Sequence, residues 1–186
     1  MAIRKIAQLG EPVLRRQARA LDAGELAGPY VTNLIEDLVE TMRDADGAGL
    51  AAPQVYESVQ LVVIEVKENP RYPGVASIPL TILANPRVTP VLDQPVAELP
   101  PRETIRVYEG CLSVAGMRGQ VARPRRVRVQ ALDRAGQPLD FIWEGFRAAV
   151  VQHETDHLNG VLMLDRTTPE GRKEALAILR PRIVLT

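Results

Sequence analysis

The most regular pattern of hydrophobic and polar residues lies between residues 31 and 42. Apolar side chains recur there every three or four positions, at Val31, Leu34, Ile35, Leu38, Val39 and Met42. This spacing places them on one stripe of a helix with about 3.6 residues per turn. We therefore predict an amphipathic helix that ends before GAG at 47–49, because glycine permits a turn.

Shorter apolar runs predict strands. The β-branched run VQLVVIEV, residues 59–66, is typical of a buried strand. The proline-rich stretch 67–80 has no sustained period, which predicts a long loop. Residues 81–93 indicate an interrupted strand, in which Pro86 and Pro90 suit an edge or a bulge.

The stretch RPRRVRV, residues 123–129, alternates arginine with valine toward its end and precedes the turn DRAG at 133–136. With Phe141 and Trp143 on the following run, it predicts a hairpin with one solvated face. We place the arginines of this stretch on that face, with contact to an acidic partner as the functional alternative. Near the start, residues 10–18 contain Pro12, which favours an extended arm.

Strands and helices are segregated along the chain, which favours the α+β class, with mixed or antiparallel sheets around a buried central helix. At 186 residues and 20.5 kDa, the chain is long enough for one hydrophobic core, so we predict a single domain over residues 1–186. The 23 basic residues balance the 23 acidic ones, so the net charge offers no attraction for nucleic acid or an anionic membrane.

No apolar run reaches the roughly 18 residues that a membrane span needs, and the N-terminal stretch lacks the apolar core of a signal peptide. The single cysteine cannot form an intramolecular disulfide, which fits a reducing compartment and leaves the thiol free for metal binding or catalysis. These features predict a cytoplasmic protein.

Both histidines of the chain lie in GFRAAVVQHETDHLNG, residues 145–160, which is apolar at its start and ends in the helix-stopping pair Asn-Gly. On a helix, His153 and His157 are four positions apart and project from one face, so both imidazoles can bind one ion. Glu154 completes the H-E-x-x-H arrangement, in which the glutamate acts as a general base toward a metal-activated water.

The third protein ligand has two candidates. Met163 occupies the position at which one protease class has a third histidine, so that ligand is absent. Glu174, on a predicted C-terminal helix, could complete a zinc peptidase site. The other candidate is Cys111, in the glycine-flanked segment YEGCLSVAG, whose thiol a divalent cation would deprotonate. Spacing alone leaves both candidates open.

Three segments, in this order along the chain, resemble the signature motifs of the peptide deformylase family: GAGLAAPQ at 47–54, EGCLS at 109–113 and QHETDHLNG at 152–160. Together with GEPVLRRQA at 10–18, the resemblance covers the chain from about residue 5 to about residue 166. One departure is SVAG at 113–116 in place of the commoner SVPG or SIPG. It follows Cys111, the metal ligand that the resemblance implies, and should matter little.

The resemblance implies a divalent metal ion held by Cys111, His153 and His157. Fe(II) is the ion implied natively, whereas Zn(II), Ni(II) or Co(II) is acceptable to the same ligands in purified protein. Glu154 would act as the general base and then as the acid.

Two further residues match family positions that donate hydrogen bonds to the developing oxyanion. They are Gln54, through its side-chain amide, and Leu112, through its backbone N–H.

The implied reaction removes the formyl group from the N-terminal formyl-methionine of nascent polypeptides and releases formate. The resemblance also implies a methionine pocket with walls at Ala48, Val107, Phe146, Ala149 and Val150. Gly49 would offer backbone to the bound peptide, and Arg118 matches an arginine near its path. Glu109 and Asp156 would orient ligands or act structurally.

The stretch 67–80 looks like the insertion of a subgroup that includes organellar enzymes. Arg172, Lys173, Arg180 and Arg182 in the short C-terminus suggest docking on the ribosome, as related bacterial enzymes are thought to do. Two other functions remain as alternatives. One is the zinc peptidase with Glu174 as third ligand, and the other is a metal- or peptide-binding module without activity.

Overall fold

A computed structural model describes residues 2–67, 76–92, 101–168 and 171–173. Two helices of more than one turn dominate, α2 (Pro29–Asp44) and α3 (Phe146–Leu158). The shorter helical elements are α1 (Ala23–Leu26), α4 (Met163–Arg166) and three 3₁₀ turns, η1 (Pro12–Arg15), η2 (Ala52–Val55) and η3 (Pro101–Glu103). The strands are β1 (Gly49–Ala51), β2 (Leu61–Val66), β3 (Ile78–Pro90), β4 (Thr104–Cys111), β5 (Val114–Pro124), β6 (Arg126–Leu132) and β7 (Pro138–Glu144).

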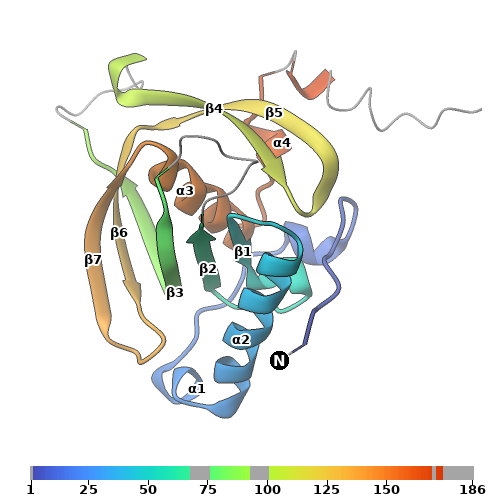
Figure 1. Ribbon diagram of the computed structural model, residues 1–186, viewed down its shortest axis with the longest axis vertical. Helices are drawn as coiled ribbons and strands as arrows, with labels where there is room; N and C mark the ends of the chain where they lie inside the picture. The colour runs from blue at the N-terminus through green and yellow to red at the C-terminus, as the bar shows by residue number, and fades with distance from the viewer. Residues whose placement is uncertain (1, 68–75, 93–100, 169–170, 174–186) are drawn as a thin grey trace, which may run out of the picture.

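The strands form two antiparallel sheets, one of five strands in the order β1-β2-β3-β6-β7 and one of two strands, β4-β5. Helix α3 lies between them, with the larger sheet on one side and the β4–β5 ribbon on the other (Figure 1). The α+β class is therefore confirmed. No helix among the described residues is long and apolar enough to cross a membrane.

Helix α2 confirms the helix predicted from the apolar stripe. Pro29 occupies its first turn, where a missing N–H costs nothing. The side chains of the stripe are all buried: Val31, Leu34, Ile35, Leu38, Val39 and Met42. They form a core cluster with Leu61 and Val63 of β2. Removing one such leucine from water contributes about 2 kcal/mol, so this stripe is what holds α2 against the sheet.

The segment around Pro12 is not the extended arm that the sequence predicts. Residues Pro12–Arg15 form the 3₁₀ turn η1, with Pro12 at its first position. The reason is tertiary, because the turn lets Leu14 reach a buried cluster with Ala7 and Leu162. The fixed dihedral of proline suits the start of a helical turn as well as an extended chain.

The loop predicted over 67–80 ends earlier than expected, because β3 already begins at Ile78, which is buried and pairs with Val66. Residues 68–75 of this stretch lie outside the described residues.

The predicted interruption of the next strand is confirmed. The β3–β6 register shifts between Ala84 and Arg87, and Asn85 has a φ of 50°. Since β3 is an inner strand, Pro86 is accommodated by this bulge and not by a sheet edge. The side chain of Asn85 donates to the carbonyl of Leu21 and accepts from its N–H, both at 2.8 Å, which secures the bulge.

Strands β6 and β7 form the predicted hairpin, in which Val129 pairs with Phe141. Arg126 and Arg128 lie on its solvated side as predicted. Arg123 does not, and its assignment to the solvated face was wrong. It belongs to β5 and is only 3% exposed, because its strand turns this side chain toward α3.

Candidate metal centre

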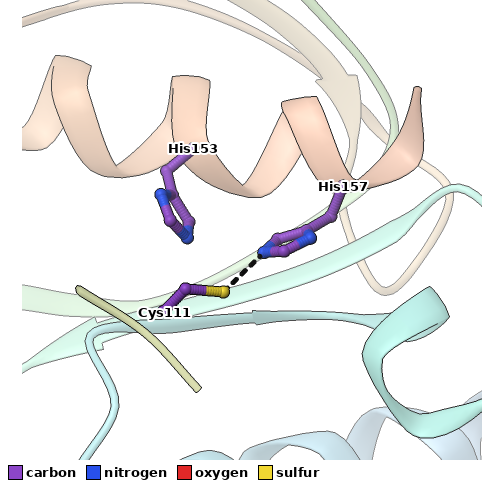
Figure 2. Close-up of side chains that lie close together, drawn as sticks. All are labelled: Cys111, His153 and His157. Carbon is purple, nitrogen blue, oxygen red and sulfur yellow. Dashed lines mark hydrogen bonds between the residues drawn. The ribbon is translucent and has the colours of Figure 1, made fainter. Parts of the chain in front are cut away.

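Helix α3 carries two of the predicted ligands. It follows Gly145, whose φ of 61° starts the helix after β7, and it ends before Asn159 and Gly160 as predicted. It is buried on nearly every side because sheets flank it. His153 and His157 lie one turn apart and project from the same face of the helix toward Cys111 (Figure 2).

Cys111 reaches the two histidines from the end of β4. The β4–β5 register shifts between Gly110 and Cys111, so the ribbon turns tightly there. The Cys111 Sγ lies 3.3 Å from the His157 Nε2, and one ligand atom from each of the three residues lies within 4.8 Å of the others (Figure 2). A thiolate and two imidazoles so close together suit a divalent transition-metal ion with tetrahedral coordination.

The pKa values of the two imidazoles are shifted in opposite directions. Burial lowers the pKa of His153, but its hydrogen bonds with Cys111 and Glu109 outweigh burial and raise it well above the ordinary value, so a bound metal ion would have to replace the proton on its Nε2. Burial lowers the pKa of His157, which favours the neutral ring that a metal requires. The Nδ1 of His153 lies 2.8 Å from a carboxylate oxygen of Glu109. We assign the proton to Nδ1, since this leaves Nε2 free to act as a ligand.

Behind His153 lies a buried chain of charges. The family resemblance pointed to its two carboxylates, Glu109 and Asp156, but not to the arginine that joins them. Arg123 donates from Nε and Nη2 to both oxygens of Glu109, and from Nη1 to Asp156 at 2.9 Å. Arg166 donates to the other side of Asp156 at 2.7 Å. Burial alone would raise the pKa of Glu109, but Arg123 and His153 outweigh it and lower the pKa to about 2. The carboxylate that holds His153 is therefore ionised, as a ligand-orienting group should be.

Glu154 faces the cavity next to the ligands. It is 4% exposed, and its Oε2 is buried without a hydrogen-bond partner among the described residues. Burial raises the pKa of Glu154 to about 7, close to neutral pH, where a group that both takes and returns a proton is most effective. A Cβ at Gly49 would lie 2.5 Å from the Glu154 Oε1, which is closer than van der Waals contact. Any larger residue at position 49 would therefore displace this carboxylate.

Gln54 is held in one orientation by groups on two segments. Its Oε1 accepts from the Ala51 N–H at 2.9 Å, and its Nε2 donates to the Ser113 Oγ at 3.1 Å and lies 3.8 Å from the Cys111 Sγ. The amide therefore presents its N–H side to the ligand cluster. The sequence did not single out Ser113, although it is the last residue of EGCLS.

A cavity of about 300 Å³ opens beside the ligands. Its walls include every residue expected for the methionine pocket and the peptide path, namely Ala48, Gly49, Val107, Arg118, Phe146, Ala149 and Val150. Gln54, Leu112, Glu154, Cys111 and His153 line it as well. Asp46, Tyr108 and Met117 also line it, and the sequence offered no pattern that would have singled them out. Glu174 lies outside the described residues.

Comparison with known proteins agrees with this geometry. The family described as polypeptide deformylase matches residues 3–173. A peptide deformylase of Leptospira biflexa is 46% identical over 167 residues, which are 89% of this chain and 88% of that protein. Peptide deformylase 1 of Nitrosomonas europaea is 43% identical over 160 residues, 86% of this chain and 85% of that protein.

Solved structures are similar as well. The Met-Ala-Ser-bound class I type b peptide deformylase of Acinetobacter baumannii superposes with a TM-score of 0.80 at 35% identity, covering 89% of this chain and 98% of that one. The actinonin-bound form of the same enzyme has a TM-score of 0.75 at 31% identity, covering 90% of this chain and all of that one. The overall fold is therefore shared with these enzymes, and the family match over residues 3–173 spans the segment of α3 and of both sheets.

Proposed function

The chain belongs to the peptide deformylase family, and from this we propose that its cavity hydrolyses the formyl amide of N-terminal formyl-methionine on nascent peptides. Water adds across the C–N bond, so that formate leaves and the peptide keeps a free α-amino group. The observation that carries the proposal is the Cys-His-His cluster beside a buried glutamate at the wall of one cavity.

Cys111, His153 and His157 would hold a divalent ion, because their ligand atoms converge and the donor set suits such a metal. When bound, the ion supplies a Lewis acid that polarises the formyl oxygen and lowers the pKa of water. We propose Fe(II) as the native ion, with Zn(II), Ni(II) or Co(II) accepted by the same ligands in purified protein. Metal analysis of the sample used for the assay identifies the ion.

Glu154 would move the proton. Its carboxylate takes a proton from the attacking water and returns it to the leaving nitrogen, after which the C–N bond breaks. Its burial and its pKa near 7 support this role, because a carboxylate with that pKa gives up a proton as readily as it takes one. General acid-base catalysis of this kind contributes about 100-fold or more.

Gln54 and Leu112 would stabilise the oxyanion. The side-chain amide of Gln54 points its N–H toward the cluster because Ala51 and Ser113 fix its other contacts. The backbone N–H of Leu112 follows directly after Cys111, at the same cavity wall. Loss of one such donor costs on the order of 100-fold in rate.

The methionine side chain would fill the apolar part of the cavity. Val107 faces it from β4, and Phe146, Ala149 and Val150 from α3. Gly49 would offer backbone groups to the peptide, and Arg118 would lie along its path. A cytoplasmic location and docking on the ribosome stay predictions, and Arg180 and Arg182 lie outside the described residues.

The decisive test is release of formate from formyl-Met-Ala-Ser by protein loaded anaerobically with Fe(II). We expect activity in the wild type, its loss in Glu154→Ala with the metal retained, and no change in Glu144→Ala, a matched change at an exposed glutamate. Absence of formate from the Fe(II)-loaded wild type would overturn the proposal and favour a binding module.

The zinc peptidase alternative is not favoured, because Cys111 already completes a three-ligand cluster with the histidines. Cys111→Ser should abolish metal binding, whereas Glu174→Gln should leave the metal content unchanged. The reverse result would restore Glu174 as the third ligand.

A further inference from the structure

The N-terminal arm, residues 6–9, contacts both segments that carry the proposed oxyanion donors. The Ala7 N–H donates to the carbonyl of Gln54 at 2.7 Å, and the Leu9 N–H donates to the carbonyl of Ser113 at 2.8 Å. Between them, the Nε2 of Gln8 donates to the carbonyl of Leu112 at 3.1 Å, and it also lies 3.3 Å from the carbonyl of Ile6. The arm thus links two chain segments that meet only in the folded protein.

These contacts bear on the direction of the Leu112 N–H, which lies in the Cys111–Leu112 peptide plane and so depends on ψ of Cys111 and φ of Leu112. On one side, the pairing of Cys111 with Val114 holds the preceding peptide unit. On the other side, Gln8 and the Leu9 N–H hold the carbonyls of Leu112 and Ser113. With the peptide units on both sides fixed, the N–H of Leu112 keeps one direction, and a preorganised donor needs no reorientation during the reaction.

The arm itself is firmly anchored except at Gln8. Ala7 is fully buried, and Leu9 packs against the cluster of Val114, Met117 and Leu164, which Cys111 also touches. Gln8, by contrast, is exposed, so its side chain contributes little to the core. Gln8 is exposed, yet its amide donates to a carbonyl beside the cavity. This hydrogen bond is therefore better explained by the positioning of the Leu112 backbone than by a contribution to the stability of the fold.

We propose that Gln8 is a positioning residue for the hydrolysis, because its side-chain amide holds the Leu112 carbonyl and thereby aims the Leu112 N–H at the oxyanion. The inference rests on the proposed function. It concerns a residue outside the three sequence motifs and outside the cavity wall.

The test is Gln8→Glu, which keeps the shape of the side chain but replaces the donating amide with a carboxylate that repels the Leu112 carbonyl. We expect kcat to fall about three- to tenfold, the worth of one modest hydrogen bond. KM, metal content and melting temperature should stay near wild-type values. Gln8→Lys, which retains donors, should recover part of the lost kcat. Gln17→Glu, the same change at another exposed glutamine of the N-terminal region, should behave as wild type.

A second measurement does not depend on activity. Hydrogen exchange of the amides in residues 110–116 should be faster in Gln8→Glu than in the wild type or Gln17→Glu. If the wild type releases formate and Gln8→Glu keeps its full kcat, the positioning role is wrong. It is also wrong if kcat falls only together with metal content and melting temperature. If the wild type itself releases no formate, the proposed function fails instead.

Discussion

Arg123 and Arg128 make the same bond in opposite surroundings. Each donates from Nε and Nη2 to both oxygens of one carboxylate, Arg123 to Glu109 and Arg128 to Asp140. The Arg123 side chain is 4% exposed and the Arg128 side chain 53%. An exposed pair exchanges readily with water and salt, whereas breaking a buried pair leaves a charge without compensation. The free energy lost when either ion pair is broken therefore depends on the burial of the pair and not on the geometry of its hydrogen bonds.

The buried arginine is also connected to the metal centre. Arg123 binds Glu109, which holds His153, and it binds Asp156 on the same helix as both histidines. It thereby joins the β4–β5 ribbon to α3 at the point where the ligands converge. The Arg128 pair joins only neighbouring strands of one hairpin.

The largest effect should come from Arg123→Met. This change leaves the carboxylates of Glu109 and Asp156 buried beside each other without their shared cation, so we expect a loss of about 3–5 kcal/mol in the free energy of unfolding. Urea unfolding of the metal-free protein measures it. Arg128→Met is the matched control, and equal losses in the two variants would contradict the role that we assign to burial.

The second largest effect should be a loss of stability in acid, where the carboxylate of Glu109 becomes protonated. Arg123 and His153 outweigh burial and hold the pKa of Glu109 at about 2, below its ordinary value of 4.5. A lowered pKa stabilises the fold above the ordinary value, and this contribution disappears as the pH falls from about 4.5 toward 2. The shift corresponds to a contribution on the order of 3 kcal/mol.

The pH dependence is measured by comparing the unfolding free energies of the wild type and Glu109→Gln. Their difference should shrink from about pH 6 to about pH 3. A difference that stays constant over this range would mean that the Glu109 carboxylate is not the titrating group.

A smaller effect should appear in metal binding. Glu109→Gln removes the charge behind His153 but keeps an oxygen that can accept from its Nδ1, so we expect a loss of metal affinity of about tenfold, at the low end for such orienting partners. Competition with a chelator measures it. Asp140→Asn, the same change in the exposed pair, should leave the affinity unaltered.

The smallest effect should come from the exposed pair itself. We expect Arg128→Ala to leave the urea midpoint and the rate of formate release within experimental error of the wild type, because water replaces the lost contact. A clear shift of the urea midpoint would show that this ion pair stabilises the fold despite its exposure.

Several features could be predicted because they depend on neighbours in the sequence. The apolar stripe of α2 and the facing pair His153 and His157 follow from the helical period, and the β6–β7 hairpin follows from the alternation of valine and arginine. The third metal ligand could not be predicted in this way. Spacing left both Cys111 and Glu174 as candidates, and the family resemblance favoured Cys111.

Other features were missed or wrong because they depend on distant segments. Arg123 stands in the same alternating stretch as Arg128, yet the strand that contains it faces α3, and no local pattern shows this. Pro12 is compatible with an extended chain and with a helical turn, and Leu14 decides between them by reaching its buried cluster.

The sequence by itself determined which residues share a face of a helix or strand, since the backbone repeats within a few residues and carries that information locally. Only the tertiary structure decided that Cys111 meets His157, that Ser113 turns the amide of Gln54, and that Arg123 is buried while Arg128 is not. Burial and electrostatic strength depend on which distant segments cover a group and exclude water from it. Those segments are brought together only by folding.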